Sequence, residues 1–216
     1  MFLFTVENIS KIKDVKYTSE PIPEKKKERI EYAQKEGLFK DFNYQKYKVK
    51  PFPKNSSMRT YSELNYLNDL PEDKEFVKKH DDIEEVFKEV CNDYNVEYPE
   101  ELVNELLKSS AGIILDLKYH YNRPRPKQLA KEYNMSLGGL KLESMSSPSY
   151  PSGHSTQGIL IGKVLQTKLP ITTDAFLQAG KRISYSRNLA RAHYTSDSQM
   201  GEELGDALFR YIREKI

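Results

Sequence analysis

A short stretch near the C-terminus combines residue types that suit phosphate chemistry. Arg187, His193 and Asp197 lie within eleven residues of one another. His193 and Asp197 are four residues apart, so a helix that begins near Tyr194 would bring the carboxylate within one turn of the imidazole. Asp197 could then hold His193, and the guanidinium of Arg187 could bind an anion.

The helical periodicity around this stretch directs charged groups toward the interior. Phe176, Gly180 and Ile183 have the spacing of a buried helix face, and Arg187 continues it. Asp197 extends the apolar stripe of the following helix in the same way. Buried charges are costly unless they are paired or bind a counter-ion. The pattern therefore predicts either a structural Arg–Asp salt bridge or a ligand site.

Two earlier segments carry groups of the same kind. A helix predicted over residues 99–121 places Lys118 on its apolar face, and the X-Pro steps that follow fix the directions of Arg123 and Arg125. Residues 151–154 form a turn with Ser and Gly that enters a buried helix, and such a turn exposes N–H groups to an anion.

The remaining elements predict an all-α protein, a bundle of about six or seven helices. Apolar periodicity predicts further helices over residues 61–70 and 82–94, whereas residues 127–150 are expected to form a loop or lid over the site. Residues 1–53 are rich in Lys, Glu, Tyr and Pro and are interpreted as an irregular arm that wraps a catalytic domain of residues 54–216. Tyr44 and Tyr47 would anchor this arm.

Composition narrows the class of protein. The net charge of +2 is nearly balanced and gives no argument for a nucleic-acid partner, and we expect none. Cys91 is the only cysteine, so no intrachain disulfide can form, and its neighbours indicate a core hydrophobe. The apolar N-terminal start meets Glu7 without a positive segment, and no apolar run is long enough to span a membrane. We therefore expect a soluble, cytoplasmic protein without membrane insertion.

The chain resembles the type 2 phosphatidic acid phosphatase superfamily, which includes class A acid phosphatases, membrane lipid phosphatases and vanadium haloperoxidases. The resemblance covers residues 118–197 and consists of three motifs, which read Lys118-x6-Arg125-Pro126, Pro151-Ser-Gly-His154 and Ser186-Arg187-x5-His193-x3-Asp197. Arg123-Pro124 lies two residues before the position that the spacing selects, so Arg123 is expected to be a rim cation or to face solvent.

The resemblance implies a role for each catalytic residue. The histidine that matches His193 attacks phosphorus and forms a phosphohistidine that water then hydrolyses. Asp197 would stabilise the positive imidazole, and His154 would protonate the leaving group and then activate water.

The resemblance also implies a phosphate-binding set, which comprises Lys118, Arg125, Ser152, Gly153 and Arg187. Three cations place and stabilise a phosphoryl group without a metal. The sequence has only four histidines and no carboxylate cluster at ligand spacing, so we expect no cofactor and no divalent ion.

The expected function is that of a metal-independent phosphomonoesterase acting on small molecules. A vanadate-dependent haloperoxidase and a lysophospholipid or lipid phosphate phosphatase are alternatives, because the resemblance includes those branches. A phosphate-binding or nucleic-acid-binding module without activity is a third possibility. Exposed tyrosines in the arm would suit a homodimer contact.

Overall fold

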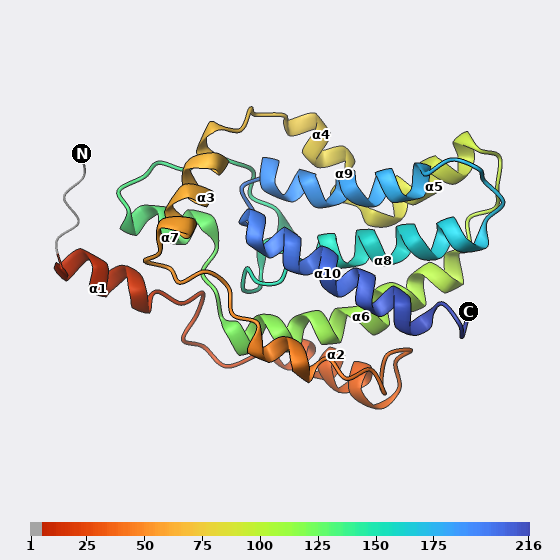
Figure 1. Ribbon diagram of the computed structural model, residues 1–216, viewed down its shortest axis with the longest axis horizontal. Helices are drawn as coiled ribbons and strands as arrows, with labels where there is room; N and C mark the ends of the chain where they lie inside the picture. The colour runs from red at the N-terminus through yellow and green to blue at the C-terminus, as the bar shows by residue number, and fades with distance from the viewer. Residues whose placement is uncertain (1–5) are drawn as a thin grey trace.

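The computed structural model describes residues 6–216, and the regular elements in this part of the chain are helices, with no β-strand (Figure 1). The predicted all-α class is therefore confirmed, although the described residues form more α-helices than the six or seven expected. The helices are α1 (Val6–Asp14), α2 (Glu24–Lys35), α3 (Met58–Asp69), α4 (Lys74–Lys79), α5 (Ile83–Asp93), α6 (Glu100–Tyr121), α7 (Pro126–Glu132), α8 (Gly153–Lys168), α9 (Ala175–Leu189) and α10 (Thr195–Ile212), with short 3-10 helices η1 (Gln45–Val49) and η2 (Glu143–Met145). Most of the apolar start, residues 1–5, lies outside the described residues.

Helix α8 is the centre of the bundle, because α6, α9 and α10 all pack against it. Glycines lie where α8 and α9 approach each other most closely. A Cβ atom on Gly180 of α9 would lie 2.4 Å from the carbonyl oxygen of Gly158, and one on Gly162 would lie 2.6 Å from that of Phe176. Only glycine permits backbones to approach this closely.

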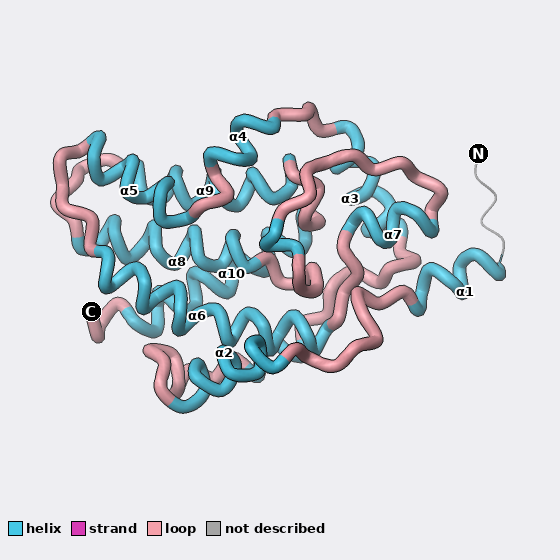
Figure 2. The backbone as a smooth tube through the Cα atoms, turned by 180° about the vertical axis from the view of Figure 1, so that it is seen from behind, coloured by secondary structure: helices cyan, strands magenta, loops and turns pink. Residues whose placement is uncertain are grey.

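Four helix ends meet at one end of this bundle (Figure 1). They are the C-terminal ends of α6 and α9 and the N-terminal ends of α8 and α10. Loops before α8 and between α9 and α10 cross the same region, which Figure 2 shows from behind. The arrangement brings the charged motifs together although they are far apart in the sequence.

The predicted helix boundaries agree with the structure to within a few residues. Ser57 caps α3, because its hydroxyl accepts a hydrogen bond from the N–H of Thr60 at 3.2 Å. Asp82 caps α5 in the same way, with bonds of 3.0 and 3.1 Å from the next N–H groups. Cys91 is fully buried in the core, as expected.

The segment after the X-Pro steps is more regular than predicted. Residues 127–150 were expected to form a loop, but α7 and η2 lie in it. The helix α7 begins with Pro126 at its first position, and Gln128 closes the first turn by accepting from the N–H of Arg125 at 2.8 Å. Its few apolar residues gave too short a pattern to predict a helix.

The arm is also more regular than predicted. Helix α1 packs against α7, and α2 packs against α6. A Cβ on Gly112 of α6 would lie only 2.1 Å from the carbonyl oxygen of Arg29 in α2. Tyr44 and Tyr47 are buried, so their predicted anchoring role is confirmed, and the Tyr44 hydroxyl donates to Asp116 at 2.8 Å.

The expected exposure of the arm tyrosines is wrong. Tyr17 and Tyr32 are half-buried, and the other two are buried. The hydroxyl of Tyr32 donates to Glu105 at 2.8 Å, and that of Tyr17 donates to the carbonyl of Met145 at 3.3 Å. The surface on which a homodimer contact was suggested is thus used within the chain.

Among the described residues, no helix combines the length and the apolar composition that a membrane crossing requires.

The contact between α2 and α6 can be tested by replacing Gly112 with alanine. Alanine favours a helix by about 1 kcal/mol over glycine, yet we expect Gly112→Ala to lower the free energy of unfolding by about 1–3 kcal/mol because α2 must shift. Chemical denaturation measures this. Asn104→Ala, on the exposed face of the same helix, is the control and should be neutral or stabilising. A Gly112→Ala variant as stable as the wild type would contradict the packing.

Candidate active site

Helix α10 begins just after His193, and its first turn supplies the carboxylate that holds this histidine. Asp197 Oδ2 accepts hydrogen bonds from the N–H of Tyr194 at 3.0 Å and from His193 Nδ1 at 3.2 Å. The first bond satisfies an N–H group at the helix start and turns the carboxylate toward His193. An ionised carboxylate only accepts, so Nδ1 carries the proton and Nε2 carries the lone pair.

Asp197 also binds a second buried side chain, Arg123. Arg123 Nη1 donates to Oδ1 at 2.5 Å, and the hydroxyl of Ser149 donates to Oδ2. Burial alone would raise the pKa of Asp197, but the charge of Arg123 and the hydrogen bonds outweigh it and hold this pKa well below its usual range. The carboxylate therefore stays ionised.

Arg123 is neither a rim cation nor solvent-facing, so that expectation is wrong. The side chain has 0% exposure, and its Cζ lies 3.8 Å from the ring centroid of Tyr194 and 4.8 Å from that of Phe52. Its Nη2 donates to Glu63 at 3.3 Å. Two carboxylates and two aromatic faces offset the cost of burying this guanidinium.

Three further cations are buried at this end of the bundle, as predicted: Lys118, Arg125 and Arg187. Arg125 is in contact with the nucleophile candidate, because its Nη1 lies 3.0 Å from His193 Nε2. Lys118 Nζ donates to two backbone carbonyls, at 2.7 and 3.3 Å.

These cations lack full charge compensation. Burial, and then the neighbouring positive charges, lower the pKa of Lys118 well below its usual value, and burial lowers the pKa of Arg125 to about 10. Carbonyl oxygens satisfy the N–H groups but do not cancel the charge. An anion that entered the cluster would be stabilised by all three cations.

The N-terminus of α8 joins the same cluster. The hydroxyl of Ser152 accepts from the N–H of Ser155 at 3.3 Å, and the N–H of Ser152 donates to the carbonyl of Asp197 at 3.0 Å. Gly153 lies beside Lys118, since a Cβ there would be 3.9 Å from Lys118 Cε. The Ser152 hydroxyl acts here as a helix cap, so its phosphate contact stays a prediction.

Asp81, in the turn between α4 and α5, connects His154 with Arg187. Its carboxylate accepts from Arg187 Nη1 at 2.5 Å, and its backbone carbonyl accepts from His154 Nε2 at 3.0 Å. Sequence reasoning missed Asp81, because no pattern around it marks a site. A carboxylate of the protein itself thus lies against a cation that was expected to bind phosphate.

Ser144 of η2 connects Arg187 with Arg125. Its hydroxyl accepts from Arg187 Nη2 at 2.8 Å, and its carbonyl accepts from Arg125 Nη2 at 3.4 Å. The segment that contains η2 therefore covers the cations, which agrees with the expectation of a lid. Through these shared partners, the predicted site residues form one connected group.

Glu63 of α3 is a further residue that sequence reasoning missed. It accepts hydrogen bonds from the Thr195 hydroxyl at 2.7 Å and from the Ser196 N–H and hydroxyl at 2.8 and 2.9 Å. Glu63 lies on the same helix face as Leu67, four residues later. The sequence feature that could have indicated its role is a carboxylate on an otherwise apolar helix face.

Both histidines of the site are uncharged. Burial lowers the pKa of His193 and of His154 well below the usual value, and the charges of Arg125 and Arg187, respectively, lower it further. Within residues 6–216, no group of three or more His, Cys, Asp or Glu side chains could hold a metal ion. The independence from divalent ions stays a prediction.

Comparison with known proteins does not assign this chain to a family. No protein-family model matches this chain, and no curated protein matches it. Function is therefore inferred from the residues and contacts described above.

The uncharged histidines predict how stability depends on pH. The unfolded chain binds a proton at each histidine below about pH 6.5, whereas the folded site excludes it, so stability should fall as pH decreases from 7 to 5. Each histidine contributes up to about 1.4 kcal/mol per pH unit. Denaturation of His193→Asn should show a shallower slope than the wild type. An unchanged slope would contradict the buried, neutral imidazole.

Proposed function

We propose that this protein is a phosphomonoesterase in which His193 attacks phosphorus and carries the phosphoryl group as phosphohistidine. One observation supports this most strongly. The buried His193 is held at Nδ1 by the ionised Asp197, at 3.2 Å, while its Nε2 faces the guanidinium of Arg125 at 3.0 Å. This is an oriented nucleophile beside an anion-binding group.

The lone pair of Nε2 is covered in the free site. Arg125 Nη1 donates to it, so a phosphate oxygen that accepts from Arg125 would release the lone pair for attack. The Nε2–P bond then forms while the bond from phosphorus to the leaving oxygen breaks. Asp197 stabilises the positive imidazole that results.

His154 supplies the proton for the leaving oxygen. Its pKa is low in the free site mainly because of burial and the Arg187 charge, and a bound phosphate dianion would raise it. The Nε2 atom of His154 is bonded to the carbonyl of Asp81 at 3.0 Å, so Nε2 can donate to a leaving oxygen only after this contact breaks. In the second step the neutral imidazole accepts a proton from the attacking water.

The three buried cations stabilise the charge on the phosphoryl oxygens. Phosphoryl transfer needs placement and charge stabilisation more than further covalent chemistry. Lys118, Arg125 and Arg187 come from three separate segments, and all three are buried at the same end of the bundle, where one bound anion could contact them. We further propose that the bundle is of the type 2 phosphatidic acid phosphatase kind, with small phosphomonoesters as substrates.

Hydrolysis of p-nitrophenyl phosphate tests the proposal. We expect phosphate release that persists in EDTA, falls when vanadate is added, and decreases by at least about 10³-fold in His193→Ala, because the nucleophile is lost. Lys168→Ala, at the far end of α8, is the control and should retain activity. Absence of hydrolysis, together with peroxide-dependent halide oxidation that needs vanadate, would instead establish the haloperoxidase alternative.

Removing the Asp81 carboxylate tests its competition with the substrate. An incoming phosphate must replace Asp81 at Arg187, so Asp81→Asn should lower KM for p-nitrophenyl phosphate by roughly three- to tenfold. Asp82→Asn is a matched control, because it removes the same charge one residue away and asparagine still caps α5. Equal KM changes in both variants would show a general field effect and contradict the specific contact.

A further inference from the structure

A pocket beside the candidate active site is not used by the proposed chemistry. Its volume is about 570 Å³, which is within the range of small-molecule sites, roughly 300–1,000 Å³. Arg125 lines it, and the same side chain contacts His193 Nε2 at 3.0 Å. One guanidinium therefore separates this pocket from the nucleophile.

The pocket has an apolar part that is firmly held. Tyr17, Leu142 and Met145 line it. The N–H of Tyr17 donates to the carbonyl of Asn122 at 3.0 Å, and its hydroxyl donates to the carbonyl of Met145 at 3.3 Å. These contacts give a fixed surface for the carbon framework of a ligand.

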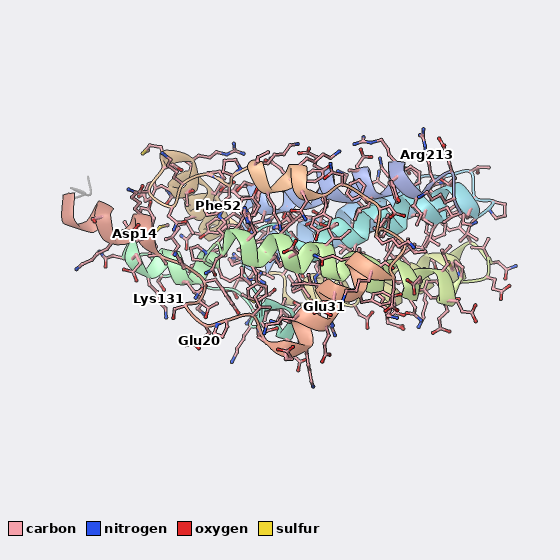
Figure 3. All side chains as sticks on the ribbon, turned by 90° about the horizontal axis from the view of Figure 1, so that it is seen from below. Asp14, Glu20, Glu31, Phe52, Lys131 and Arg213 are labelled. Atoms are coloured by element: carbon pink, nitrogen blue, oxygen red, sulfur yellow. The ribbon has the colours of Figure 1, made fainter. Side chains whose placement is uncertain are left out.

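The rest of the pocket is strongly positive. Lys127 and Lys131 lie four residues apart on α7 and so share one helix face, and Lys141 adds a third ammonium group. Lys131 projects outward from α7 in Figure 3. The three lysines are exposed, and none forms an ion pair with a described residue. Glu143 is the one acidic residue in the lining.

The segment around η2 lies between the pocket and Arg187. Glu143 and Met145 face the pocket, whereas Ser144 between them binds Arg125 and Arg187. The bond from Arg125 to Ser144 is long, at 3.4 Å. Displacement of Ser144 by a substrate phosphate would join the pocket to His193.

We propose that this pocket receives the leaving group of the substrate and that this leaving group carries a second phosphate beside its carbon framework. The substrate class is thus bisphosphorylated small molecules, an inference that rests on the proposed function. Lysine ammonium groups bind phosphate as point charges. At His193 the phosphorus–oxygen bond of one ester breaks, and the second phosphate leaves with the alcohol product.

Paired substrates test the inference. We would compare kcat/KM for fructose 1,6-bisphosphate with that for fructose 6-phosphate and fructose 1-phosphate. The wild type should prefer the bisphosphate by roughly tenfold, mainly through KM. A triple variant with Lys127→Gln, Lys131→Gln and Lys141→Gln should lose this preference while hydrolysing p-nitrophenyl phosphate within about twofold of the wild type.

The matched control removes the same charge elsewhere. Lys35→Gln at the end of α2, Lys168→Gln at the end of α8 and Lys40→Gln together replace three exposed lysines that do not line the pocket, and this variant should keep the preference. Equal kcat/KM for mono- and bisphosphates, or a preference that survives the triple pocket variant, would overturn the inference while leaving the phosphatase proposal intact.

Calorimetry separates the two proposals if no ester is hydrolysed. Titration of the wild type with fructose 1,6-bisphosphate would then show whether the pocket binds it. Binding that is tighter than for fructose 6-phosphate and is lost in the triple pocket variant would support the second-phosphate site although the proposed hydrolysis had failed. No such difference would overturn both.

Discussion

The ion pair between Asp197 and Arg123 is the interaction on which the rest of the site depends. The same carboxylate accepts from the first turn of α10, from Ser149 and from His193, so it fixes a helix start, a loop and the nucleophile candidate together. Loss of one partner of such a buried pair typically costs about 3–5 kcal/mol. The need to keep this carboxylate ionised explains why Arg123 is buried instead of exposed.

Among the proposed phosphate-binding residues, buried cations outnumber carboxylates. Lys118, Arg125 and Arg187 are buried with fewer carboxylates than cations, and Asp81 binds one of them from a distant turn. The free protein therefore satisfies part of the proposed phosphate site with its own groups. Affinity for a phosphate ester would be the difference between the contacts it makes and those of Asp81 and Ser144 that it replaces.

A feature of this site could be predicted from the sequence where it depends on residues that lie close together in the chain. The burial of Arg187 was predictable because this residue continues an apolar helix face, and helical periodicity is set by nearby residues. The contact between Asp81 and Arg187 could not be predicted, because it depends on how two segments that are distant in the sequence meet in the fold. The X-Pro steps fixed the backbone near Arg123, but carboxylates on α3 and α10 determined which way its side chain turned. Helix α2 was missed because its charged composition leaves few apolar positions to show a period.

Direct detection of the covalent intermediate tests the central claim most directly. A His154→Gln variant should still transfer phosphate from p-nitrophenyl phosphate, whose leaving group needs little proton donation, but should hydrolyse the intermediate slowly. Alkaline quenching during turnover, followed by mass spectrometry of the peptides, is predicted to show one phosphoryl group on His193. Turnover without phosphoryl transfer to His193, or with the phosphoryl group on another residue, would contradict the account.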